Sequence, residues 1–346
     1  MTHPRGEIAG MRNAYRAYAA KRLVQAVIVI LLAYVLTFVV VSILPGDPIT
    51  SVLRDPQSGF TEEQIRAIIA AQGLDRPIPV RLWISLSHFL IGDFGLSMRS
   101  SRPVATLINE VLPSTLILAS AGLLVALLLA GALAYGTQFL PKRFGQGFLR
   151  GAPSLFLSVP NFVIGLVLIH VFGFQLGLFR VIEPNSVWAT VFASIALGIS
   201  VSARIAEVLI ANLDHESGQE YAAVARARGL GHARLFLSHL LKPSSLPVVT
   251  VIVLTIGELL GGSLITETVF GRAGIGSLVQ RSATTHDLPV LQAVVSLAAV
   301  VFVLANLMAD LVYPLLDPRV KLFGDPAPRL ANAKESAVNA SGAVTP

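Results

Sequence analysis

Six blocks of apolar residues, each about the length needed to cross a bilayer, restrict the fold of this chain more than any other feature. A helix rises about 1.5 Å per residue and the hydrocarbon core is about 30 Å thick, so roughly twenty apolar residues span it. The sequence therefore predicts an all-α, polytopic membrane protein with about six transmembrane helices. The predicted spans cover residues 23–43, 114–139, 152–174, 187–205, 246–265 and 289–311.

Composition supports a membrane protein and excludes several functional classes. Of the 346 residues, 54% are hydrophobic and 13% charged, whereas soluble globular domains carry about 25% charge. An ordinary cytoplasmic enzyme is therefore excluded. The absence of cysteine removes disulfide frameworks, thiolate nucleophiles and cysteine-ligated metals. The net charge of +6 is also typical of membrane proteins with a basic cytoplasmic side, so lipid, and not nucleic acid, is the expected contact.

The distribution of Lys and Arg predicts the orientation of the spans. The first block is too long for a secretory signal and no small-x-small cleavage site follows it, so we expect a cytoplasmic segment 1–22 and a retained span 23–43. Basic residues concentrate in the termini and in the connections near 140–151 and 206–245. The two short loops on the other side hold Arg180, Arg272 and Arg281. Both termini are therefore expected in the cytoplasm.

The long connection 44–113 is predicted to form a small external domain. Thr61 is a candidate N-cap for a short helix that has Glu62 and Glu63 in its first turn and Gly73 as a stop signal. The apolar stretch 81–92 is too short to span a bilayer and is expected to lie in the interface or over the spans. At the other end, residues 323–346 have little apolar bulk and are expected to be disordered.

Residues 219–241 form the most informative connection. Small apolar residues alternate with basic ones around Gly229-Leu230-Gly231, a pattern typical of two short amphipathic helices joined by a glycine hinge. The residues alone leave two interpretations open. The segment is either a basic loop held against anionic headgroups or a docking element for a protein partner.

Short motifs along the chain resemble one family of transport proteins. Gln219-Glu220-Tyr221 followed by AVARARGL at 223–230 resembles the cytoplasmic EAA loop of permease subunits in bacterial ABC importers. Other matches occur in the expected order, and together they resemble the first, "B"-type, permease of the dipeptide, oligopeptide and nickel group over about 16–322. They are LPGDP at 44–48, GLDRP at 73–77, GDFGLSMRSSRPV at 92–104, LPSTL at 112–116, GELLGGSLITETVF at 257–270 and DLVYPLLDPRV at 310–320. The chain departs from the family at Ala223, where other branches have glutamate, and at Ala273-Gly274, where Pro-Gly is frequent.

The resemblance implies a type I importer fold and a set of partners. A permease core 114–322, with a coupling loop at 206–245, would form half of a pathway for dipeptides or oligopeptides, or alternatively for nickel. It implies a heterodimer with a second permease, two ATP-binding subunits that hold the ATP and Mg, and an extracytoplasmic substrate-binding protein, in the bacterial inner membrane. The residues expected to transmit ATPase motion are Glu220, Ala223, Ala225, Arg226, Ala227, Arg228, Gly229 and Leu230.

The sequence carries no pattern for catalysis or a metal site. Gly271, Gly274 and Gly276 have neither the spacing nor the lysine of a phosphate-binding loop. His215-Glu216 begins a zinc motif, but Gln219 stands where the second histidine is required. We therefore expect no enzyme activity and no cofactor on this chain. The alternative class of function is an autonomous ion-coupled transporter or a lipid-modifying enzyme. Autonomous transporters usually show an internal repeat, and the six predicted spans show none.

Two acids within apolar context are candidates for the pathway. Glu258, Gly261 and Gly262 are the residues expected to line the pathway, with a structural hydrogen bond as the alternative role for Glu258. Asp310 is expected at the cytoplasmic edge, near the basic tail.

Overall fold

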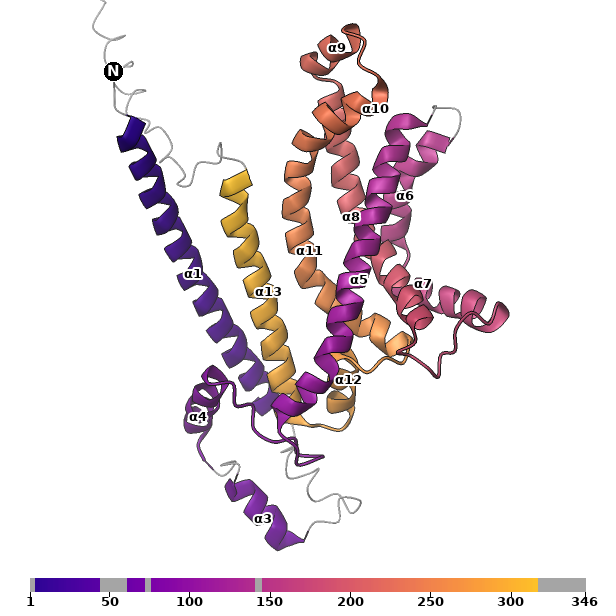
Figure 1. Ribbon diagram of the computed structural model, residues 1–346. Helices are drawn as coiled ribbons and strands as arrows, with labels where there is room; N and C mark the ends of the chain where they lie inside the picture. Colours follow the sequence, from indigo (N-terminus) through magenta and orange to yellow (C-terminus); the bar gives the residue numbers. More distant parts are fainter. Residues whose placement is uncertain (1–3, 44–60, 72–75, 141–144, 317–346) are drawn as a thin grey trace, which may run out of the picture. The chain divides into compact units, whose positions relative to one another are not determined.

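The computed structural model describes residues 4–43, 61–71, 76–140 and 145–316, which are almost entirely helical (Figure 1). Within these ranges, five helical segments are long and apolar enough to cross a membrane, and a bent pair of helices makes up a sixth. The all-α prediction with about six spans is confirmed. The five are Tyr15–Val40, Val104–Phe139, Val187–Ser217, His232–Leu259 and Leu288–Met308.

The first helix differs from the expected division at residue 22. Helix α1 (Pro4–Ile43) runs without a break from the N-terminal segment into the first span. Residues 11–22 lack proline and glycine and are rich in alanine and arginine, which favour helix, so nothing ends a helix there. The predicted boundary marks a change of polarity and not of structure.

The chain divides into two compact units, residues 1–25 with 310–346, and residues 26–309. In the first unit, Arg22 Nη1 and Asp310 Oδ2 form an ion pair with a separation of 3.0 Å. The Tyr15 hydroxyl donates to the carbonyl of Leu311 at 3.0 Å. Asp310 is thus neutralised inside its own unit. The predicted disordered tail 323–346 lies outside the described residues.

The connection after α1 contains two short helices, α3 (Glu62–Ala71) and α4 (Ile78–Leu90). The predicted N-cap is confirmed, because the amide of Gln64 donates to Thr61 Oγ1 at 3.3 Å. Helix α4 packs through Phe89 on Tyr34 of α1, with ring centroids 4.5 Å apart, and leaves Trp83 exposed. The LPGDP motif and the stop signal Gly73 lie outside the described residues.

The second span begins ten residues earlier than its hydropathy predicts. Helix α5 (Val104–Phe139) starts directly after Pro103. Its first turns bury Val104, Ile108 and Val111 at helical spacing against helices α12 (Ile275–Thr284) and α13 (Leu288–Leu316). Polar residues on the opposite side lower the mean hydropathy of these turns, so hydropathy marks the apolar run from 114 and not the start of the helix that carries it.

The third block is two helices and not one straight span. Helix α6 (Gly147–Ser158) is followed by α7 (Asn161–Leu168) and a π-helical turn η2 (Ile169–Gln175), with a bend of 100°. Pro160 causes the break. Proline has no amide hydrogen for the helix ladder and forces the residue before it into an extended conformation, and Val159 has φ −97° and ψ 120°.

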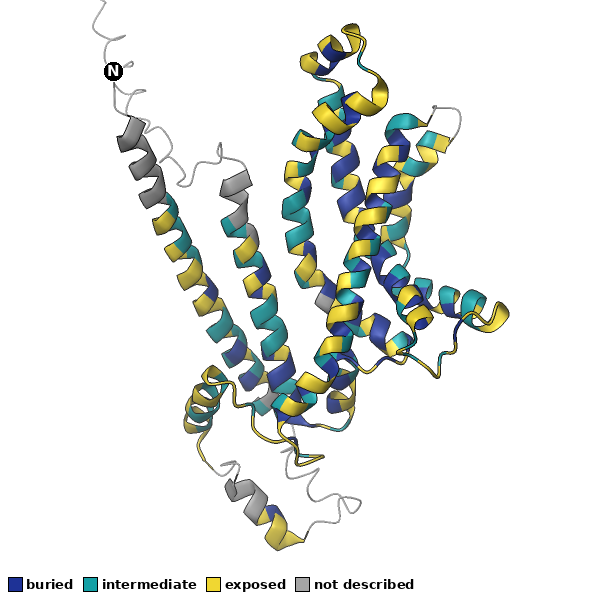
Figure 2. Cartoon of the chain, viewed as in Figure 1, coloured by how far each residue is buried: buried dark blue, intermediate teal, exposed yellow. Residues whose placement is uncertain are grey.

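Helix α8 (Val187–Ser217) is central and packs against α5, α6, α7 and α11 (Leu241–Val269). Figure 2 shows α8 largely buried. Close approach to α5 depends on Gly198, because a Cβ there would lie 2.6 Å from Val125 Cγ1. Since α8 continues to Ser217, the first twelve residues of the predicted loop 206–245 are helical. The remaining elements are α9 (Glu220–Ala227), α10 (His232–Leu235) and the π-helical turn η3 (Phe236–Leu240).

Candidate functional site

The coupling segment, residues 218–231, turns the chain away from α8 and contains α9. Hydrogen bonds hold it to the end of α8. Arg226 Nη2 donates to the carbonyl of Ser217 at 3.0 Å, and the Tyr221 hydroxyl donates to Glu216 Oε2 at 2.5 Å. Burial and, to a lesser extent, the bond to Glu216 raise the pKa of Tyr221 to about 12. The phenol therefore stays protonated, and available as a donor, throughout the physiological range.

The two faces of α9 differ in what they contact. Ala222 and Ala225 are buried and face the body of the protein, while Tyr221 and Val224 are 40% and 50% exposed. Sequence reasoning missed these two apolar residues, although their spacing of three is the signal of a common helical face. Of the residues predicted for coupling, Ala225 is buried, Leu230 is half-buried, and the others are exposed, namely Glu220, Ala223, Arg226, Ala227, Arg228 and Gly229.

The predicted glycine hinge is present at Gly229. Its backbone has φ +79°, a left-handed conformation that side chains with a Cβ rarely adopt. The turn is closed by the amide of Leu230, which donates to the carbonyl of Ala225 at 3.2 Å. Gly231 follows in an ordinary extended conformation, with φ −64° and ψ 150°, and caps α10. The requirement for glycine is therefore specific to position 229.

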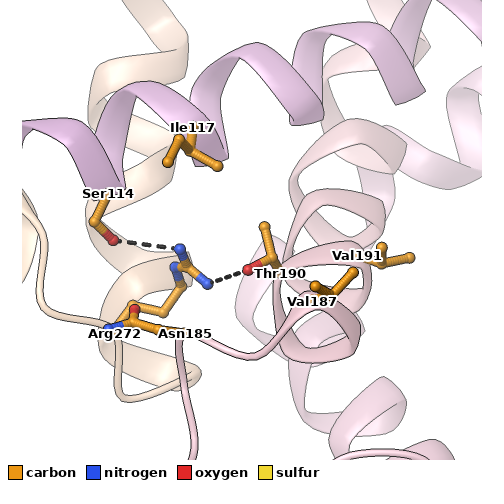
Figure 3. Close-up of a pocket in the computed structure, with 7 residues that line it drawn as sticks. All are labelled: Ser114, Ile117, Asn185, Val187, Thr190, Val191 and Arg272. Atoms are coloured by element: carbon orange, nitrogen blue, oxygen red, sulfur yellow. Dashed lines mark hydrogen bonds between the residues drawn. The ribbon is translucent and has the colours of Figure 1, made fainter.

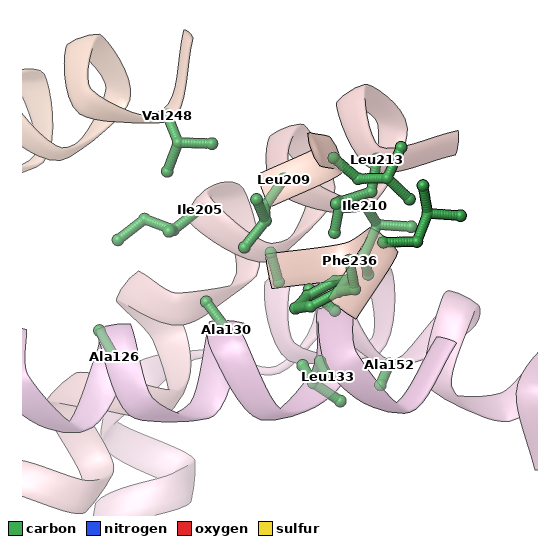
Figure 4. Packing of buried hydrophobic residues seen from close by; sticks show 14 of the residues in the cluster. Ala126, Ala130, Leu133, Ala152, Ile205, Leu209, Ile210, Leu213, Phe236 and Val248 are labelled. Atoms are coloured by element: carbon green, nitrogen blue, oxygen red, sulfur yellow. The ribbon is translucent and has the colours of Figure 1, made fainter. Parts of the chain in front are cut away.

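A hydrophobic cluster joins the coupling segment to the spans (Figure 4). Ala222 and Ala225 belong to the same cluster as Leu213 of α8 and Phe236 of η3. The Phe236 ring packs edge-on against Phe139 of α5, with centroids 5.5 Å apart. Through these closely packed side chains, α9 is in contact with the cluster that also includes α5 and α8.

Asp214 adds polar contacts beside this cluster. Arg150 of α6 pairs with Asp214, with Nη2 donating to Oδ1 at 2.9 Å. Gln138 Nε2 of α5 donates to the same oxygen at 3.0 Å. Three helices therefore meet at one carboxylate in the last turn of α8, next to the coupling segment.

The predicted pathway residues lie in α11. Glu258 forms an ion pair with Arg204 of α8, and the two side chains are 48% and 56% exposed. Gly261 is exposed, with no atom within 4 Å of where its Cβ would be. Gly262 instead faces the protein, where a Cβ would lie 3.1 Å from Leu197. Glu258 and Gly261 thus share an exposed side, and Gly262 allows α11 to approach α8.

Sequence reasoning missed a third acid, Glu267, which is fully buried near the end of α11. Glu267 Oε1 accepts from Thr115 Oγ1 at 2.6 Å, and Oε2 accepts from the amide of Gly276 at 2.7 Å. A Cβ on Gly274 would lie 2.2 Å from the carboxyl carbon of Glu267. The glycines at 274 and 276 therefore make room for this carboxylate, and their spacing was the available signal.

Arg272, on the turn after α11, joins three elements beside Glu267. Its Nη1 donates to the carbonyl of Pro184 and to Thr190 Oγ1, both at 2.7 Å, and Nη2 donates to Ser114 Oγ at 3.3 Å. An open pocket of about 450 Å³ borders this guanidinium (Figure 3). Burial lowers the pKa of Arg272, and the carboxylate of Glu267 opposes that shift. This corner holds α5, α8 and α11 together.

Comparison with known proteins decides the family. Residues 122–322, more than half of the chain, match the family described as the binding-protein-dependent transport system inner membrane component. The chain belongs to this family. It is an ABC importer permease of the peptide and nickel group, a transport subunit without an ATPase site of its own. Such a permease works in the bacterial inner membrane with another permease, ATPase subunits and a binding protein.

Relatives match this permease over nearly its full length. Glutathione transport system permease proteins GsiC from Salmonella typhimurium (strain LT2) and Escherichia coli (strain K12) are each 32% identical over 305 residues. The match covers 88% of this chain and 98% of each relative. A solved inward-facing structure of the MetNI methionine ABC transporter aligns with a TM-score of 0.52 at 15% identity, covering 61% of this chain and 96% of that one. That likeness supports the fold alone.

Proposed function

We propose that this permease forms half of an import pathway for small peptides. The observation that carries the cargo class is the 32% identity, over 88% of the chain, to permeases named for glutathione transport. Glutathione is itself a small peptide, with the charged amino and carboxylate groups that dipeptides and oligopeptides also carry. Nickel, imported by other members of the same group, is the competing cargo that the experiment must include.

In the proposed mechanism, α9 is the element on which the ATPase subunits act. Its outer face offers Tyr221 and Val224 as apolar contacts, with Arg228 at the rim to pair with acidic groups. Its inner face rests on the cluster that joins α5, α8 and η3. ATP and Mg bind to the two ATPase subunits, and their closure displaces α9 and moves these helices.

The proposal also includes the assembly and the orientation. This chain pairs with a second, homologous permease, and an extracytoplasmic binding protein delivers the cargo. Both termini and α9 lie in the cytoplasm, because the basic residues gather on that side. Glu258 and Gly261 line the pathway, while Gly262 lets α11 approach α8.

Uptake measurements test the cargo. Cells lacking this chain, and the same cells with the chain restored, are given labelled dipeptide, glutathione, a longer peptide and nickel in parallel. We expect restoration of peptide uptake only. Restoration of nickel uptake alone would reassign the cargo to the metal, and the absence of any restored uptake would refute the importer role.

A charged substitution on α9 tests the docking face. Val224→Asp places a charge on an exposed position, so the fold is unaffected, but the apolar contact with the ATPase subunits is lost. We expect reduced recovery of the ATPase subunits with the tagged permease, and loss of uptake. Val80→Asp on α4, also at an exposed valine, is the control and should change neither. Full uptake by Val224→Asp would exclude this face.

Cysteine labelling tests the orientation, since the chain has no cysteine of its own. An impermeant maleimide added outside intact cells should label Ser87→Cys on α4 and spare Ala233→Cys on α10. The reverse pattern would contradict cytoplasmic placement of the coupling segment.

A further inference from the structure

Three charged residues lie on exposed sides of α8 and α11. On α11, Glu258 and Gly261 are both exposed and lie three residues apart, hence on one side of the helix. On α8, Arg204 and Glu207 are exposed with the same spacing. We call these four residues the charged face. The ion pair between Arg204 and Glu258 joins its two helices.

The charged face lies at mid-helix and not at a helix end. Arg204 is 17 residues after Val187 and 13 before Ser217, about 26 and 20 Å from the two ends of α8. Glu258 is 17 residues after Leu241 and 11 before Val269, about 26 and 17 Å from the ends of α11. Glu258 lies inside the predicted span 246–265, about 10 Å from its nearer end. Its ion pair with Arg204, at the end of the predicted span 187–205, holds both charges beside the hydrocarbon core.

Lipid does not suit this surface. Charged side chains at bilayer depth are costly in hydrocarbon and face protein or a water-filled cavity. The exposed side of α5 differs from this face, because it carries Leu116, Leu124 and Leu128, which are side chains compatible with lipid. Between residues 111 and 139, α5 has no charged residue at all. The charged face is therefore covered by protein or open to water.

The number of donors on Arg204 sets what a dry contact with protein would require. A guanidinium has five N–H donors, and among the described residues Glu258 is the acceptor that the structure gives Arg204. A dry subunit contact would leave the other donors unsatisfied unless a partner supplied several acceptors, and such burial costs several kcal/mol per ion. Water satisfies these donors and leaves the guanidinium accessible to an anion.

We propose that Arg204 and Glu258 line a water-filled part of the pathway and bind the two charged ends of a peptide in transit. This rests on the proposed function for its cargo. A guanidinium binds a carboxylate through two parallel hydrogen bonds, and a carboxylate accepts from an ammonium group. Without cargo the two side chains neutralise each other, and a peptide carrying both charges replaces one ion pair with two.

Cysteine accessibility in the assembled importer tests for water. Gly261→Cys introduces a thiol where a Cβ meets open space, without removing either charge, in a chain that has no other cysteine. Leu128→Cys on α5, 65% exposed in the isolated chain, is the matched control. We expect a charged thiosulfonate reagent to label Gly261→Cys in proteoliposomes and to spare Leu128→Cys. If Gly261→Cys is unlabelled in both the ATP-free and the ATP-bound complex, the face is a dry subunit contact and the proposal is overturned.

Paired substitutions test the binding of cargo. Arg204→Met and Glu258→Gln each leave one unpaired charge, whereas Arg204→Met/Glu258→Met removes both charges together. If the pair is only structural, the double variant should recover uptake lost in the single variants. We expect instead that the KM for peptide remains raised about tenfold or more in the double variant, because the charge-assisted bonds to the cargo are gone.

The readouts separate failure of this proposal from failure of the proposed function. Assembly and basal ATPase activity of the double variant should equal those of the wild type. The matched control is the exposed pair Arg102 and Glu110, and its conversion to methionines should leave the KM unchanged. A double variant with wild-type KM overturns cargo binding, even if peptide uptake itself is established. If the wild type imports only nickel, peptide is not the cargo. Labelling of Gly261→Cys then still shows whether water reaches the charged face.

Discussion

Replacement of Gly229 isolates the contribution of one backbone conformation to transport. The residue has φ +79°, and a Cβ at this position would meet no atom within 4 Å. A substitution therefore adds backbone strain without any steric clash. Placing an L-residue in the left-handed region costs about 1–2 kcal/mol, and a β-branched side chain costs more.

The expected series follows from that strain. A cost of 1–2 kcal/mol lowers the ratio of native to non-native hinge conformations by about 5- to 30-fold. Asparagine tolerates the left-handed region best among the alternatives. Uptake should therefore decrease in the order Gly229, Gly229→Asn, Gly229→Ala and Gly229→Val, with transport abolished in the last variant.

Uptake and ATPase activity in proteoliposomes, together with thermal unfolding in detergent, measure the effect. The melting temperature should be little changed, because the hinge lies outside the buried clusters. Gly231→Ala is the matched control, since that residue has φ −64° and also meets open space. Wild-type uptake by Gly229→Val, or equal impairment by Gly231→Ala, would refute the argument from backbone conformation.

Three other substitutions have effects set by local packing. Leu197→Ala, in the fully buried core, should destabilise by about 2–5 kcal/mol and lower the melting temperature, whereas Leu128→Ala, at an exposed position of α5, should not. Gly276→Ala places a Cβ 2.3 Å from the backbone of α11 and should cost about 1–3 kcal/mol, whereas Gly131→Ala, in open space, should be tolerated. Because the pKa of Tyr221 is raised to about 12, the stability it contributes should be present below pH 10 and lost between pH 10 and 12. In an ultraviolet titration, the Tyr221→Phe variant should lack the tyrosine ionisation near pH 12.

The apolar blocks were sufficient to predict the fold class because every span must satisfy its backbone hydrogen bonds within a helix. They were insufficient for the boundaries. The start of α5 is amphipathic, so its burial of Ile108 against another helix is invisible to mean hydropathy. The bend at Pro160 occurs inside an apolar run, where hydropathy is the same for a straight and a broken span. Pro160 was the local signal for that break, whereas the start of α5 depends on contacts between helices, which one segment does not encode.

The three acids show why site residues are harder to predict than spans. Hydropathy singled out Glu258 and Asp310 because each interrupts an apolar run, and it overlooked Glu267 because that residue lies between two threonines. The structure separates them by their partners. Asp310 is neutralised by Arg22, and Glu267 is enclosed by Thr115 and the glycine turn after α11. Glu258 pairs with Arg204 on a surface that remains open. Partners up to 288 residues away in sequence decide whether a carboxylate in an apolar run is neutralised, enclosed or exposed. Of the three acids, only Glu267 has a nearby local signal, in the glycines at 274 and 276.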